Sequence, residues 1–253
     1  MALTPLPVQI DLDQLLCHER GKRGKHGEPY LWTIFFKLDG TTASMSDPDF
    51  TLSGPATTAP APGSHGDLGA QKIQSGDTIP IPAAVGHWQT TLTPIPVAEQ
   101  FQKAGAPASI GGALGVAMIL LEQEWTSERV AEAGHAALNT AVQQELNRIV
   151  DGIGLKHPKL TPADFEGVAG TVKQSIKSAI LKESSIFQDV ANLINKDAVL
   201  GMQFAVVTHK ELATNPSQPL SERFQPKDRG DWEIRGAVKA DAASSIPAGP
   251  PAS

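Results

Sequence analysis

Three residues near the N-terminus carry atoms that bind metal ions. Cys17, His18 and His26 offer the thiolate and imidazole donors that zinc prefers. A structural zinc site needs four converging ligands, so Glu19 or a distant group would have to complete the set. Cys17 and His18 are neighbours on an expected strand and point to opposite faces, which makes joint ligation awkward. We therefore favour a partly buried cysteine beside a solvent-facing histidine, and expect no cofactor.

Aspartates in loops form a second possible cation site. Asp47 and Asp49, followed by Asp67 and Asp77, supply carboxylate oxygens, and calcium takes six to eight oxygen ligands. The sequence has no dense alternating acidic run. Aspartate is also common at turns, because its side chain hydrogen-bonds the nearby backbone. Turn residues are the favoured interpretation, and calcium is the alternative.

Acid–base chemistry has one candidate group. Glu132 and His135 lie three residues apart on an expected helix, so their side chains can meet. Glu124 precedes them, at the end of the strand that leads into that helix. No activated nucleophile is apparent nearby, and the chain has no phosphate loop, dinucleotide fingerprint, nucleophile elbow or zinc-protease helix motif. A helix-surface ion pair is therefore preferred over a hydrolase.

A basic cluster stands in the glycine-rich stretch 20–28. It consists of Arg20, Lys22, Arg23 and Lys25. A solvated hairpin loop is the favoured interpretation, with a phosphate or anionic-lipid contact as the alternative. The net charge of -6 argues against a nucleic-acid partner, which would require a basic face.

Composition indicates a soluble globular protein with 40% hydrophobic and 19% charged residues. Its 253 residues allow one large domain or two small ones. Cys17 is the only cysteine, so no internal disulfide can form. The N-terminus resembles neither a secretory signal nor a membrane span, and we expect a cytoplasmic protein.

The clearest elements are a strand over 114–125 and a helix over 126–154. Val116–Leu121 is an unbroken apolar run, too short for the roughly 20 residues of a membrane-spanning helix. Glycines just before it favour a strand over a helix. The following apolar residues recur at three- and four-residue spacing, which predicts an amphipathic helix.

Alternating or β-branched patterns predict further strands. These cover 6–19, 29–38, 86–95, 200–208 and 232–239. The first two are expected to form an antiparallel pair. Helices are expected over 161–182 and 185–195. Composition predicts a mobile loop over 44–70, a long loop over 215–229 and a disordered tail over 240–253.

The order of elements predicts an α+β fold. Its core is an antiparallel β-sandwich-like structure with an inserted block of two or three helices. Residues 1–125 would form the β-rich part, 126–197 the helical block and 198–239 strands that rejoin the first sheet. Strands and helices do not alternate strictly, so a doubly wound fold is not expected.

These features favour a non-catalytic binding or assembly protein that uses sandwich loops and a helical interface. Its partner would be another protein or a second copy of the chain. The first alternative is a membrane-acting protein whose helical block inserts into lipid, suggested by the glycine-rich apolar segment 109–121. The second is a hydrolase built on the Glu/His pair.

Overall fold

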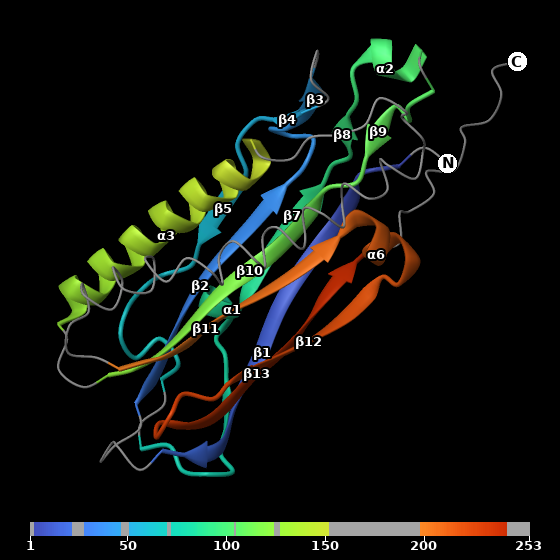
Figure 1. The fold of residues 1–253 in the computed structure, drawn as a ribbon. Coiled ribbons are helices and arrows are strands. Elements are labelled where there is room, and N and C mark those ends of the chain that lie inside the picture. Colours follow the sequence, from blue (N-terminus) through green and yellow to red (C-terminus); the bar gives the residue numbers. More distant parts are fainter. Residues whose placement is uncertain are drawn as a thin grey trace, which may run out of the picture.

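The protein consists mostly of antiparallel β-sheets with a few helices (Figure 1). The computed structural model describes residues 3–21, 28–46, 51–69, 72–103, 105–123, 127–151 and 198–241. The helices in this part of the chain are α1 (Ala83–Gly86), α2 (Glu99–Lys103), α3 (Glu128–Asp151) and α6 (His209–Thr214).

Two larger sheets contain most of the strands. The first sheet contains β12 (Ser217–Phe224), β13 (Gly230–Ala240) and β1 (Leu6–Arg20), with β6 (Thr78–Pro80) and β7 (His87–Leu92) both paired to β1. The second sheet has the order β11 (Ala198–Thr208), β10 (Ala113–Glu122), β2 (Pro29–Leu38) and β5 (Thr57–Pro60). Two small sheets pair β3 (Ser44–Ser46) with β4 (Thr51–Ser53) and β8 (Ile95–Pro96) with β9 (Ser109–Ile110).

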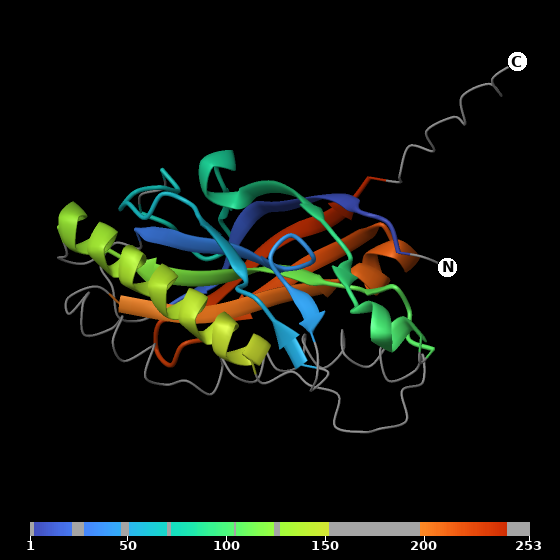
Figure 2. The ribbon, with the colours of Figure 1, turned by 90° about the horizontal axis from the view of Figure 1, so that it is seen from above.

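The second sheet contributes to two hydrophobic clusters, one on each face. One cluster combines its side chains with those of α3, and the other combines them with side chains of the first sheet. Figure 2 shows α3 lying along the second sheet. Every residue of β2 and β10 is buried, because successive side chains enter opposite clusters. This double burial explains why Val116–Leu121 is uniformly apolar instead of alternating.

The expectation that 6–19 and 29–38 form an antiparallel pair is wrong. β1 pairs with β13, β6 and β7, whereas β2 pairs with β10 and β5. The physical reason is the number of apolar faces. β1 alternates buried and exposed residues, so it belongs to a sheet with one wet face, while β2 is apolar on both faces and must lie between two layers.

Two ranges expected to be loops contain strands. β3, β4 and β5 fall within 44–70, and β12 falls within 215–229. β5 and β12 are terminal strands of their sheets. A terminal strand tolerates the prolines, serines and threonines that made these ranges resemble loops.

The expected long helix is confirmed as α3. The helices expected over 161–182 and 185–195 lie outside the described residues, as does the tail beyond residue 241. Among the helices that the structure describes, none is both long and apolar enough to cross a bilayer.

Candidate functional site

Four polar residues of α3 form a row along one side of the helix. They recur every fourth residue, which places them above one another. They are His135, Asn139, Gln143 and Asn147, and we call them the polar row. Beside them runs the apolar stripe that packs on the second sheet through Ala131, Leu138, Val142 and Leu146.

The C-terminal half of the polar row is hydrogen-bonded to the chain around β5. Gln143 Nε2 donates to the Ala56 carbonyl at 2.6 Å, and Gln143 Oε1 accepts from Thr58 Oγ1 at 2.9 Å. Asn147 Oδ1 accepts from the Ala56 backbone N–H at 3.0 Å. These side chains therefore bind the backbone of Ala56, just before β5, and the Thr58 hydroxyl within it, which ties α3 to the start of this terminal strand.

The N-terminal half of the row is not paired in this way. His135 is only 6% exposed, and its ring centroid lies 5.6 Å from that of the fully buried Trp32. Trp32 Nε1, His135 Nε2 and Asn139 Oδ1 are buried and have no hydrogen-bond partner among the residues that the structure describes. We call Trp32, His135 and Asn139 the polar corner. Native proteins contain few such groups, because each costs about 1–3 kcal/mol.

The segment opposite the polar corner explains the missing partners. The chain runs from Ala56, beside Asn147, to Gly63, beside His135. Between them stand Pro60 and Pro62, which have no backbone N–H to donate. The N–H of Ala61 is used by the Thr33 carbonyl at 3.1 Å. Pro60, Ala61 and Pro62 therefore offer no free backbone N–H to the polar corner.

Loop 61–69 packs closely against this corner. A Cβ at Gly63 would collide with the ring of His135, so only glycine fits there. The His65 ring lies edge-on to Tyr30 at a centroid distance of 4.9 Å, and His65 Nδ1 is 3.9 Å from Glu128 Oε2. Side chains of β2, α3 and the loop therefore enclose the corner.

Burial shifts the titration of two groups in this region. It lowers the pKa of His135, an effect partly offset by a hydrogen bond to the Thr33 backbone, so the ring is neutral at pH 7. It raises the pKa of Asp67 to about 7, and the charge of Glu128 acts in the same direction. Asp67 Oδ1 accepts from the Leu31 N–H at 3.1 Å, whereas Asp67 Oδ2 is buried without a partner.

The structure does not bring the expected acid–base pair together. His135 is buried against Trp32, whereas Glu132 is exposed on the same helix, and no hydrogen bond or ion pair joins them. The third candidate, Glu124, lies outside the described residues. His135 therefore belongs to the site, but without the carboxylate that a hydrolase would use.

Cys17 and His18 lie on opposite faces of β1. Burial raises the pKa of the Cys17 thiol to about 11, so it is protonated and a poor ligand or nucleophile. On the exposed face, Glu233 accepts from Ser221 Oγ at 2.8 Å and lies 2.6 Å from His18 Nε2. The guanidinium of Arg235 lowers the pKa of Glu233 to about 2. Because the serine binds the carboxylate and not the imidazole, this trio does not activate a nucleophile.

The remaining metal candidates do not converge in the part of the chain that the structure describes. Asp77 is a turn residue, since its Oδ2 accepts from the Gln74 N–H at 2.8 Å. His26, Asp47 and Asp49 lie outside the described residues. Within those residues, no three His, Cys, Asp or Glu side chains form a group that could hold a metal ion.

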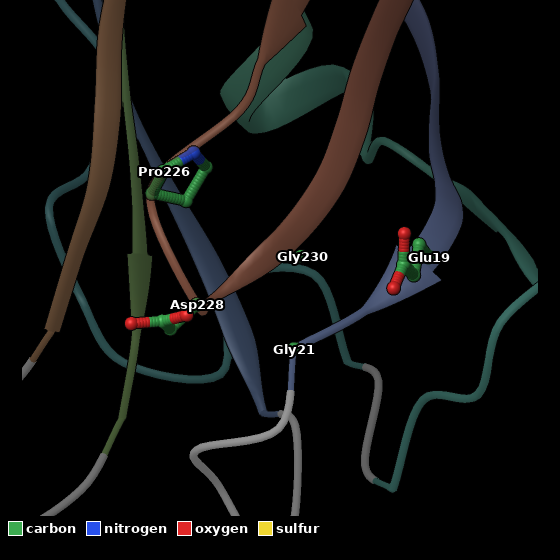
Figure 3. A pocket seen from close by; sticks show the side chains of 5 residues that line it. All are labelled: Glu19, Gly21, Pro226, Asp228 and Gly230. Carbon is green, nitrogen blue, oxygen red and sulfur yellow. The ribbon is translucent and has the colours of Figure 1, made fainter.

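A pocket of about 280 Å³ lies where the basic stretch 20–28 leaves β1. It is lined by Glu19, Gly21, Pro226, Asp228 and Gly230. Figure 3 shows the Glu19 and Asp228 side chains on different sides of it. Two carboxylates oppose the phosphate contact considered for this stretch. Arg20 lies at the end of β1, and Lys22, Arg23 and Lys25 lie outside the described residues.

Comparison with protein-family models, curated proteins and solved structures finds no match to this chain. The polar corner is therefore assessed on its own geometry. Of its members, the sequence identified only His135 as a site candidate. The four-residue spacing from His135 to Asn147, next to an apolar stripe, was the signal that could have revealed the polar row.

Proposed function

We propose that the chain is a non-catalytic binding protein with a β-sandwich-like core, and that its binding site is the polar corner. One observation carries this proposal: three polar atoms of the polar corner are buried without a partner among the described residues, whereas Gln143 and Asn147 on the same helix are hydrogen-bonded. A ligand with matching groups would remove the cost of leaving them unpaired. The site lies under a loop and against the helix α3, the two kinds of element expected to bind.

The absence of a reactive arrangement around His135 supports binding over catalysis. Glu132 is turned to solvent, and in the described part of the chain no hydroxyl or thiol is hydrogen-bonded to the His135 ring. General acid–base catalysis requires a group within hydrogen-bond reach of the proton that it moves. His135 is instead held in a neutral state between an indole ring and a glycine.

The exposed side of α3 supports a small ligand over a protein partner. Val130, at 38% exposure, is the one exposed large hydrophobic residue among those described. Stable protein interfaces have an apolar core within about 800 Å² on each partner. The described face of α3 offers no such core.

Native mass spectrometry of the protein, expressed in its source organism and purified gently, tests the proposal. We expect a monomer with a fixed added mass that is lost in the Asn139→Ala variant. The Gln144→Ala variant changes an exposed residue of the same helix and is expected to retain the mass.

Three outcomes would contradict the proposal. An added mass that survives Asn139→Ala would place the ligand elsewhere. A clean oligomer without added mass would favour assembly, and bound phospholipid would favour action on membranes.

A further inference from the structure

We infer that the ligand of the polar corner is a compact, neutral molecule that carries both a hydrogen-bond acceptor and a hydrogen-bond donor, as alcohols and primary amides do. This inference rests on the proposed function and adds the chemical class of the ligand. It follows from the donors and acceptors that the corner leaves unpaired and from the close packing around them.

The three unpaired atoms differ in what they can bind. Trp32 Nε1–H is only a donor, so the ligand must supply an acceptor. Asn139 Oδ1 is only an acceptor, so the ligand must supply a donor. The hydrogen bond between His135 and the Thr33 backbone raises the pKa of the ring, which identifies the ring as its donor. A neutral imidazole has one donor and one acceptor nitrogen, so Nε2 is a second acceptor.

This mixed set disfavours charged ligands of either sign. A cation would leave Trp32 Nε1–H without an acceptor, and an anion would leave Asn139 Oδ1 against a like partial charge. The fully buried Trp32 and the neutral His135 provide no counter-charge, and an unpaired buried ion is costly. The nearby Glu128 has a 53% exposed side chain and lies against His65, so its charge is largely solvated.

The packing of loop 61–69 limits the size of the ligand. Gly63 touches His135 so closely that no methyl group fits between them, and His65 packs edge-on to Tyr30. Any ligand must therefore be small, because loop 61–69 has to move to admit it. A larger ligand would have to displace Gly63 from His135.

Proton–nitrogen correlation spectra of the full chain test the class of ligand. The probes are acetamide and ethanol, which are neutral, with acetate and methylammonium as charged counterparts of similar size. The indole N–H resonance of Trp32, assigned with the Trp32→Phe variant, is the readout. We expect both neutral probes to shift it saturably and the charged probes, at equal concentration, to leave it unchanged. Asn139→Leu should weaken the binding of acetamide about tenfold, as loss of one buried hydrogen bond does, whereas Gln144→Leu should not.

The results separate this inference from the proposed function. A shift with acetate or methylammonium alone would overturn the neutral class while a corner-dependent added mass still supports binding. No response to any probe, in a protein that also carries no added mass, would overturn both. Equal weakening by Asn139→Leu and Gln144→Leu would show that the probes bind away from the corner, and would also overturn the inference.

Discussion

The two halves of the polar row on α3 resemble each other in sequence and differ in what they bind. Gln143 and Asn147 are hydrogen-bonded to the backbone and to Thr58 around β5. His135 and Asn139 lie on the same side of the same helix, yet each keeps a buried atom without a partner. Their surroundings differ, since Pro60, Ala61 and Pro62 offer no free backbone N–H to His135 and Asn139. Gln143 and Asn147 therefore hold the helix to the chain around β5, whereas His135 and Asn139 are the residues that we propose to bind a ligand.

Both halves of the polar row are held in place by the packing of α3 on the second sheet. The variant Leu138→Ala tests how much this packing stabilises the fold. Leu138 is fully buried in the cluster between α3 and the sheet, so its truncation should cost about 2–5 kcal/mol. The free energy of unfolding is measured by urea denaturation. Val130→Ala, at an exposed position of the same helix, should change it by less than about 0.5 kcal/mol. Equal losses of unfolding free energy in Leu138→Ala and Val130→Ala would mean that Leu138 does not pack between α3 and the sheet.

The stability of the protein should depend on the protonation of Asp67. The folded chain holds this proton up to about pH 7, whereas the unfolded chain releases it near pH 3.8. Stability should therefore fall as the pH rises between these values and level off above pH 7. With each pKa unit equivalent to about 1.4 kcal/mol, the fall is at most about 4 kcal/mol.

The variant Asp67→Asn should remove this fall in stability. Asp77→Asn, which removes an exposed carboxylate in a turn, should preserve it. Urea midpoints between pH 4 and pH 8 provide the measurement. A slope that persists in Asp67→Asn would assign the proton to another group.

The anchoring role of the paired half is tested by Gln143→Ala. This variant leaves the Ala56 carbonyl and the Thr58 hydroxyl without their partner, which should cost about 1–3 kcal/mol. Gln144→Ala gives the same gain in helix propensity at an exposed position and should not destabilise the fold. Urea denaturation of both variants shows whether the loss of stability comes from the hydrogen bonds of Gln143 or from replacing a glutamine of α3 by alanine.

The smallest loss of stability should come from Asn139→Ala, and this variant separates the two halves most directly. Removing an acceptor that has no partner breaks no bond and relieves the cost of an unpaired buried atom, so the free energy of unfolding should not decrease. Asn147→Ala makes the same chemical change where the side chain accepts from Ala56 N–H, and should cost about 1–3 kcal/mol. A similar loss of unfolding free energy in Asn139→Ala and Asn147→Ala would contradict the claim that only the C-terminal half of the polar row stabilises the fold. Thermal or urea unfolding provides the measurement.

Local patterns were sufficient to predict α3 and the strands with strong periodicity. β10 and β2 were identified from apolar runs and β-branched residues, because burial on both faces imposes such composition. The pairing of β1 with β13 joins opposite ends of the chain, and no local pattern encodes a partner at that distance. β5 and β12 were missed because terminal strands need few apolar residues.

The site was less accessible to prediction than the fold. His135 attracted attention through its spacing from Glu132, but the helix turns Glu132 to solvent and His135 to Trp32. Trp32 appeared only as a residue of a strand, since nothing local shows that its indole N–H lacks an acceptor. Orphaned atoms are a property of the packed chain, so the polar corner could be found only in three dimensions.

The pairing of β10 with β11 has a consequence for how the chain could have acquired α3. Glu122 and Ala198 are partners in the ladder, so the chain leaves the sheet and returns to it at neighbouring positions. The stretch 123–197 is therefore, topologically, the loop of a hairpin, and the entropy of closing a loop rises only slowly with its length. Such a stretch can lengthen or shorten over evolution while the strand order stays intact. The length of this connection is therefore free to vary, whereas the apolar stripe of α3 is fixed by its packing on the second sheet.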